Sequence, residues 1–293
     1  MRHPLENFLK SFTLAVAMGL MAMGAMGIRA PVAAEAEPAK VEEAEAPENA
    51  ISSPPMSLDD PGTPGRQGIE VNLVGTLVRA GSGRGSESLL DANYGIGDRI
   101  QLKFERPYVT ESATGEPSQK GLGATELGIK WRFVDHAGLE MAVYPNYEFD
   151  NAFTLKDAEG VPEEKAGTSF YLPLLISKTV KRVYSIGANL GYRKTQDSSR
   201  DDTIVALGIG RSLGSNARIL GEIYSERDQH WNNRQTDARI GYVRTLFPKW
   251  LADTGFEVPG FISLGRSIGA IEEGETSTSF TFGISFIKLP VGE

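Results

Sequence analysis

Apolar and polar residues alternate along most of the chain from residue 68 onward. In residues 276–289 the alternate positions are occupied by Phe280, Phe282, Ile284 and Phe286, with small polar residues between them. A period of two residues is typical of a β-strand with two unlike faces. In a soluble sandwich the apolar face must pack on a second layer, whereas in an outer-membrane barrel it contacts lipid. The remaining stretches decide between these two folds.

The clearest hairpin covers residues 93–108, where a glycine turn precedes an alternating strand. Its apolar face carries Ile100, Leu102 and Phe104, and its polar face carries Arg99, Gln101, Lys103 and Glu105. A soluble core cannot hold four such polar side chains in a row, but a watery lumen or a solvent-exposed face can. Residues 123–134 repeat the pattern, with Leu127, Ile129 and Trp131 on the apolar face. The alternation therefore favours a barrel with lipid outside and water inside.

Such stretches recur at intervals of about 10 to 13 residues, which suits tilted transmembrane strands. They predict an all-β fold, a transmembrane antiparallel β-barrel of about twelve strands over residues 68–293. Short and longer connections alternate, which places both termini in the periplasm and the loop 150–167 outside the cell. Pro145 cannot donate to a regular ladder, so a bulge or bend is expected there. The facing of residues 260–268 is not decided by their pattern.

Two segments before residue 68 differ in composition from the barrel. Residues 1–34 combine a basic start, a short uncharged apolar run and a small-residue cleavage site, which predicts a secretory signal peptide. A membrane anchor is the alternative, but the run is short and contains three glycines. Residues 35–67 are rich in Ala, Pro and Glu. They carry few apolar side chains to offset the entropy of ordering, so a disordered periplasmic linker is predicted.

The segments NYGIGDRIQLKFERPYV and GLGATELGIKWRFV, within residues 93–134, carry a family resemblance. They resemble the paired signature of the phenol meta-cleavage-pathway family (MetA-pathway of phenol degradation) of outer-membrane transporters. In that family a Tyr-Gly-x-x-Asp turn ends one strand, Pro-Tyr ends the next, and Gly-Leu-Gly opens a later one. The resemblance implies a barrel and passage of small, including aromatic, molecules. Ala124 stands where the family carries an acidic residue, so no role of that residue is transferred.

Composition adds little to this picture but excludes some functions. The chain has no cysteine, and its formal net charge is −8. No basic cluster is present for nucleic acid to bind, so no nucleic-acid partner is expected. Asp157, Asp201, Asp202 and Asp228 lack the spacing of a calcium loop, and no metal or cofactor is predicted.

Charged residues on the polar faces are the candidate functional groups. The inward set with a predicted lumen-lining role is Arg99, Lys103, Glu105, Glu126, Lys130, Arg132, Glu140, Glu148, Arg218 and Glu222. Acids and bases are interspersed in this set. One interpretation is a polar pore whose charges screen permeating solutes. The other is a network of paired charges that fills a narrow lumen and holds the barrel together, and the sequence leaves both open.

Catalysis is the weakest of the functions considered. An outer-membrane lipase would need a nucleophile beside a base, usually histidine. Outside the signal peptide only His136 and His230 are present, and Ser225 lies near the second in sequence. Both histidines fall in predicted turns without an evident orienting partner, so the protein is predicted not to be an enzyme.

The sequence therefore predicts an outer-membrane channel for passive passage of small solutes, including aromatic or hydrophobic ones. Its expected partners are outer-membrane lipid, the barrel-insertion machinery and a small-molecule solute. The alternatives are a closed structural or adhesive barrel that binds partners through extracellular loops, and an outer-membrane lipase-like enzyme.

Overall fold

The computed structural model describes residues 53–113, 118–149, 167–181, 183–196, 201–246, 255–269 and 276–288. The predicted signal peptide and the linker up to residue 52 lie outside these residues, as does most of the loop 150–167. No helix among the described residues is long and apolar enough to cross a membrane.

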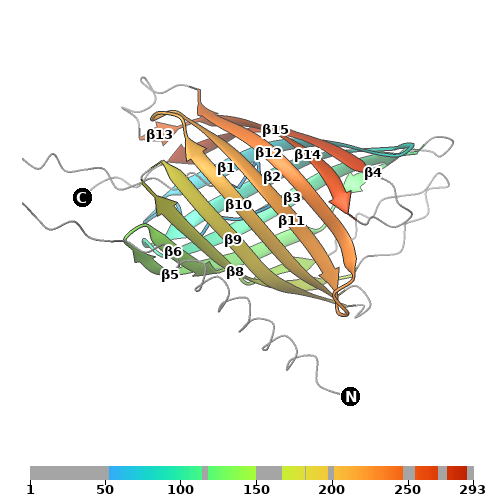
Figure 1. The fold of residues 1–293 in the computed structure, drawn as a ribbon, viewed down its shortest axis with the longest axis horizontal. Coiled ribbons are helices and arrows are strands. Elements are labelled where there is room, and N and C mark those ends of the chain that lie inside the picture. The colour runs from blue at the N-terminus through green and yellow to red at the C-terminus, as the bar shows by residue number, and fades with distance from the viewer. Residues whose placement is uncertain are drawn as a thin grey trace, which may run out of the picture. The chain divides into compact units, whose positions relative to one another are not determined.

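The described chain is built of antiparallel β-strands (Figure 1). They are β1 (Ile69–Ala80), β2 (Gly83–Ile96), β3 (Ile100–Ser112), β4 (Gln119–Leu122), β5 (Thr125–His136), β6 (Leu139–Val143), β7 (Asn146–Phe149), β8 (Ser169–Val180), β9 (Tyr184–Thr195), β10 (Asp202–Ser212), β11 (Ala217–Asp228), β12 (Asn233–Thr245), β13 (Phe256–Glu257), β14 (Pro259–Gly269) and β15 (Ser277–Lys288). Neighbours in sequence pair with one another, as in an up-and-down barrel.

The sheet closes on itself because its first and last strands pair. β1 and β15 are in register from Ile69 opposite Lys288 to Ala80 opposite Ser277. β4 and β5 both pair with β3, and β6 and β7 together fill one position between β5 and β8. With these pairs counted as single strands and the two-residue β13 left out, the barrel has twelve strands. The predicted fold class and strand number are therefore confirmed.

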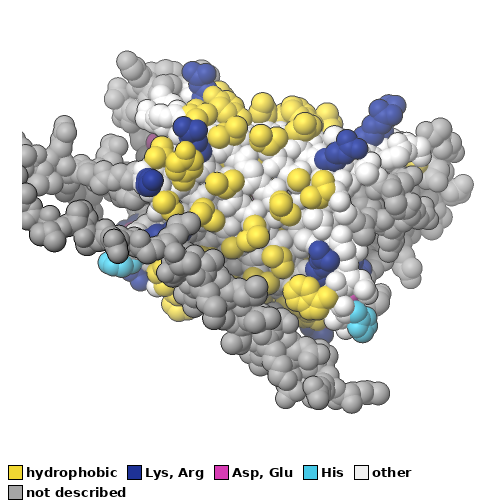
Figure 2. Space-filling view, in the orientation of Figure 1, with side chains coloured by type: hydrophobic (Ala, Val, Ile, Leu, Met, Phe, Trp, Pro, Cys, Tyr) yellow, Lys and Arg dark blue, Asp and Glu magenta, His cyan; other side chains and the backbone are white. Residues whose placement is uncertain are grey.

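The outer face of the barrel is apolar, as the alternation predicted. Leu127, Ile129 and Trp131 on β5 are each about half exposed, at 49%, 51% and 52%. Figure 2 shows hydrophobic side chains over the strands, with lysines and arginines mostly toward the ends of the barrel. On β14, Ile262 and Leu264 are also exposed, while Phe261 and Ser263 are buried, which settles the facing that the sequence left open.

The expected irregularity at Pro145 is confirmed. β6 ends at Val143 and β7 begins at Asn146, so the strand is interrupted at Tyr144 and Pro145. Their backbones still bond to the neighbouring strands, because Pro145 O accepts from Ile129 N at 3.0 Å and Tyr144 N donates to Pro173 O at 3.1 Å. The interruption leaves Tyr144 only 3% exposed. Its ring lies inside the barrel, in the site described next.

Candidate functional site inside the barrel

Residues 53–66, which we call the plug segment, run through the lumen before β1 begins. Leu58 N donates to a carboxylate oxygen of Glu222 on β11, and the Asp59 carboxylate pairs with Lys130 on β5. The strand order places β5 and β11 on opposite sides of the barrel, so the segment spans the interior. The disordered linker was predicted to extend to residue 67. Its last fifteen residues instead pack against the barrel, because partners distant in sequence satisfy them.

Two apolar side chains anchor the plug segment. Met56 packs in a cluster with Val74, Leu220, Val243 and Phe261. Leu58 is 1% exposed and packs against Ala206 and Tyr224. Burying a Met or a Leu side chain contributes roughly 1.5 to 3 kcal/mol each. This burial offsets part of the entropy that the segment loses when it is ordered.

The β11 side holds the segment by its backbone. Glu222 accepts hydrogen bonds from Ser57 N at 3.0 Å and Leu58 N at 2.8 Å. Arg239 on β12 lies 3.4 Å from the Glu222 carboxylate and donates to Ser57 Oγ at 2.8 Å. The Glu222 side chain is 1% exposed. A buried carboxylate is thus satisfied partly by the wall and partly by the plug segment.

The β5 side holds the segment by charge. Lys130 Nζ lies 3.1 Å from Asp59 Oδ1 and donates to the backbone oxygen of Asp60 at 2.7 Å. Burial raises the pKa of Asp59, but the positive charges of Lys130 and Lys103 outweigh it and hold that pKa below its ordinary value. Asp59 is therefore ionised at neutral pH, and the pair joins a full negative and a full positive charge.

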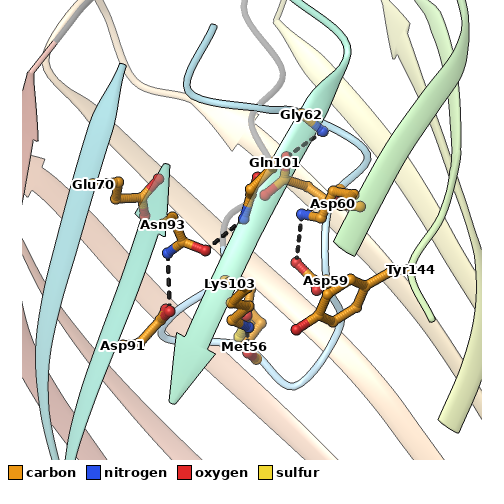
Figure 3. A network of polar contacts seen from close by, with 12 residues as sticks. Met56, Asp59, Asp60, Gly62, Glu70, Asp91, Asn93, Gln101, Lys103 and Tyr144 are labelled. Atoms are coloured by element: carbon orange, nitrogen blue, oxygen red, sulfur yellow. Dashed lines mark hydrogen bonds and ion pairs between the residues drawn. The ribbon is translucent and has the colours of Figure 1, made fainter. Parts of the chain in front are cut away.

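A tyrosine, Tyr144, and a second lysine, Lys103, lie near Asp59 (Figure 3). The ammonium nitrogens of Lys103 and Lys130 lie 5.4 and 5.8 Å from the centre of the Tyr144 ring, within range of cation–π attraction. The ring lies over Gly128, where an added Cβ would come within 2.4 Å of it. Lys103 also pairs with Glu105 at 2.6 Å. Only a glycine at position 128 leaves room for this arrangement.

Amide and carboxylate side chains of β1, β2 and β3 complete the polar wall. Asn72 donates to Glu70 at 2.9 Å and to Asp91 at 2.8 Å, and Asn93 donates to Asp91 at 2.9 Å. Gln101 continues the chain of bonds to Asn93. A cavity of about 330 Å³ lies between these side chains, the plug segment and the turn after β10. This cavity is a polar space beside the plug segment.

The other predicted lumen residues fall into three groups. Arg132 pairs with Glu140 at 2.9 Å on the neighbouring strand. Two others accept hydrogen bonds: Glu126 accepts from Tyr144 OH, and Glu148 accepts from Ser169 Oγ at 2.8 Å. Arg218 lines the cavity. Arg99 is exposed just before β3. The structure thus brings together Lys103, Glu105, Lys130 and Glu126, while Glu222 lies across the lumen; that these residues line a solute path stays a prediction.

The residues that the sequence analysis missed are those of the plug segment. Ser57, Asp59 and Asp60 carry polar contacts to the wall, and Met56 and Leu58 carry the apolar ones. The only local signal is the run MSLDDP, in which two apolar residues precede two acids inside an otherwise apolar-poor segment. Composition averaged over the whole linker hides that signal.

The two histidines lie at the ends of the barrel. His136 is the exposed last residue of β5, and His230 is exposed in the turn between β11 and β12. His230 N donates to Asp228 at 2.8 Å. Ser225 Oγ bonds to Thr236 Oγ1 at 2.9 Å.

Comparison with known proteins bears on the fold. No family model matches the chain, and no curated protein sequence matches it. Among solved structures, an outer membrane channel from Pseudomonas putida F1 is similar at a TM-score of 0.52 and 12% identity, covering 75% of this chain and 93% of that one. The NanC porin is similar at a TM-score of 0.51 and 10% identity, covering 74% and 98%. At these identities the likeness establishes the fold, which is that of the outer-membrane β-barrels.

Proposed function

We propose that this protein is an outer-membrane channel through which small solutes pass passively. The observation that carries the proposal is the content of the lumen. Buried charges on both walls, Lys130 and Glu222, hold a segment without strand structure that belongs to the chain itself. Such a segment can leave the lumen without breaking the β-ladders, since none of its residues 53–66 pairs with a strand and its bonds to the wall involve side chains. The described state is the closed one.

The wall behind the plug segment supports a polar path. Lys103, Glu105, Lys130, Arg132 and Glu222 are the proposed lining once the segment withdraws, because their charged ends already lie in the interior. Charges of both signs in a lumen favour small hydrated or polar solutes. The resemblance to the phenol-pathway transporters adds small aromatic molecules as a candidate class.

The outer surface supports a place in the outer membrane. A continuous apolar face on a closed barrel favours lipid around it, because exposing that apolar area to water is unfavourable. Outer-membrane lipid is thus the proposed immediate partner, and the insertion machinery is the proposed partner during biogenesis. Export through residues 1–34 belongs to the same proposal.

Conductance tests the channel directly. We expect the mature chain to show rare, brief openings in planar bilayers. A variant in which residues 53–64 are replaced by a Gly-Ser stretch of equal length should conduct steadily, because it lacks both anchors and the Asp59 charge. A compact unboiled band on electrophoresis, lost on boiling, shows that each barrel has formed.

The contrary result would favour the second candidate function. If the replaced variant forms a barrel and does not conduct at any voltage, the lumen is closed by its own wall. The observation that favours this second function is that the plug segment occupies the lumen. The protein would then be a closed structural or adhesive barrel, and its outer loops would be the place to search for a partner.

A further inference from the structure

The two polar contacts of the plug segment leave different groups behind when the segment withdraws. Glu222 keeps an ionic partner in the wall, because Arg239 lies 3.4 Å from its carboxylate. Lys130 does not: among the described residues, its ion pair is with Asp59, and its other bond is to the backbone of Asp60. Withdrawal therefore costs most at Lys130, whose side chain is only 4% exposed.

Water that enters as the plug segment leaves can solvate the ammonium group, but it does not replace the ion pair and the hydrogen bond that Lys130 makes in the described state. The wall carboxylate whose charge interacts with Lys130 is Glu70 on β1, and it forms no ion pair with Lys130 in the described part of the chain, where that pair is with Asp59. The second lysine, Lys103, adds a charge of the same sign. Lys103 itself is paired with Glu105 at 2.6 Å. The vacated position thus presents one unpaired ammonium group beside an aromatic ring, Tyr144.

We propose that the position of the Asp59 carboxylate is a binding site for the carboxylate group of a permeating small organic acid, with Lys130 as its anchor. In the described state the Asp59 carboxylate of the plug segment occupies this site. The inference rests on the proposed channel function and names the solute class. A solute anion and Asp59 compete for the same ammonium group, so binding of the solute favours the open lumen by mass action.

The size and chemistry of the site fit such a ligand. The cavity of about 330 Å³ beside the plug segment reaches both Asp59 and Lys130, so a small acid can approach the pair before the segment leaves. Its lining also includes the carboxylates of Asp60, Glu70 and Asp91, so the acid binds by replacing Asp59 at Lys130 rather than by occupying the rest of the cavity. When the segment withdraws, Lys130 Nζ loses two oxygen acceptors, Asp59 Oδ1 and Asp60 O. One carboxylate group of a solute can replace both. A carboxylate offers two oxygens to satisfy the ammonium donors.

Thiol accessibility in the full mature chain tests the competition. The chain has no cysteine, so Met56→Cys places a single thiol in the buried plug segment, and a water-soluble thiol reagent modifies it only when the segment is out. The barrel is reconstituted in lipid vesicles at constant ionic strength, with sodium benzoate as the probe. The control is benzamide, a neutral molecule with the same ring, together with sodium chloride to match the ionic strength.

We expect benzoate to raise the modification rate roughly fivefold, in a saturable way, when it is present at a few times its dissociation constant. Benzamide should leave the rate unchanged. In the Lys130→Gln background the basal rate should rise and the benzoate dependence should disappear. In the Lys181→Gln background, where the lost charge lies exposed in the turn after β8, the benzoate dependence should remain.

Several outcomes would overturn the proposal. These are equal effects of benzoate and benzamide, benzoate dependence that survives Lys130→Gln, or a loss of dependence on Lys181→Gln. Leu58→Cys provides a second thiol, and a response of one thiol without the other would show that the segment does not leave as a unit. Failure of the channel function is separate, because it is measured as missing conductance in the variant whose plug segment is replaced.

Discussion

Replacing Glu222 with alanine is expected to release the plug segment on the order of 100-fold more often. The change removes the acceptor of two N–H groups, a partly buried one on Ser57 and a buried one on Leu58, and leaves Arg239 without its carboxylate. A buried donor left unpaired costs about 1 to 3 kcal/mol, so losing two of them amounts to roughly 3 kcal/mol. The rate of thiol modification at Met56→Cys reports the release.

Two matched variants serve as controls for Glu222→Ala. Glu140→Ala removes another inward carboxylate, which pairs with Arg132 on β5 and accepts a hydrogen bond from Ser177 on β8. Its modification rate should stay close to that of the parent chain. Glu222→Gln keeps an acceptor for one N–H group, so its effect should be intermediate. Equal rates for Glu222→Ala and Glu140→Ala would show that Glu222 does not hold the segment.

Ile129→Arg is expected to destabilise the barrel in lipid by about 2 to 4 kcal/mol, the cost of an arginine near the middle of the bilayer. Ile129 is 51% exposed and is flanked on the same face by Leu127 and Trp131. In a soluble protein a side chain this exposed would tolerate the change within about 0.5 kcal/mol. Urea unfolding from lipid vesicles, followed by tryptophan fluorescence, measures the difference.

The control is the same substitution at the rim of the barrel. Leu213 is 45% exposed in the turn between β10 and β11, outside the strands. Leu213→Arg should cost about 0 to 1 kcal/mol, as expected near the interface. If the two substitutions cost the same, the exposed apolar face of β5 does not lie in lipid, and the assignment to a membrane fails.

Most strands follow from the sequence because they carry the same physical contrast between an apolar and a polar face. Lipid on one side and polar interior on the other impose a strict period of two, so Ile100, Leu102 and Phe104 can be assigned outward with no knowledge of their neighbours. Strand β14, whose inward residues are Phe261, Ser263, Gly265 and Ser267, shows where this reasoning ends. Its inward residues are mostly small, and the contrast between its faces is too weak for the pattern alone.

The charges inside the barrel could be placed on a face but not paired. Parity puts Lys130 and Glu222 inside, yet it cannot tell that they contact the same segment from opposite walls. Pairing depends on shear and on which strands close the sheet, and these are properties of the whole ring. The pair of Arg132 and Glu140 differs, because it joins adjacent strands and depends only on the register between them.

The sequence by itself determined a closed barrel of about twelve strands with an apolar exterior, because most strands repeat a local two-residue pattern that needs no distant partner to be recognised. Only the tertiary structure decided what fills the lumen. The plug segment has too few apolar side chains to order itself, and its order comes from Glu222, Lys130 and the Met56 pocket, which the folded barrel alone assembles. Local composition therefore predicted disorder for a segment that tertiary contacts hold in place.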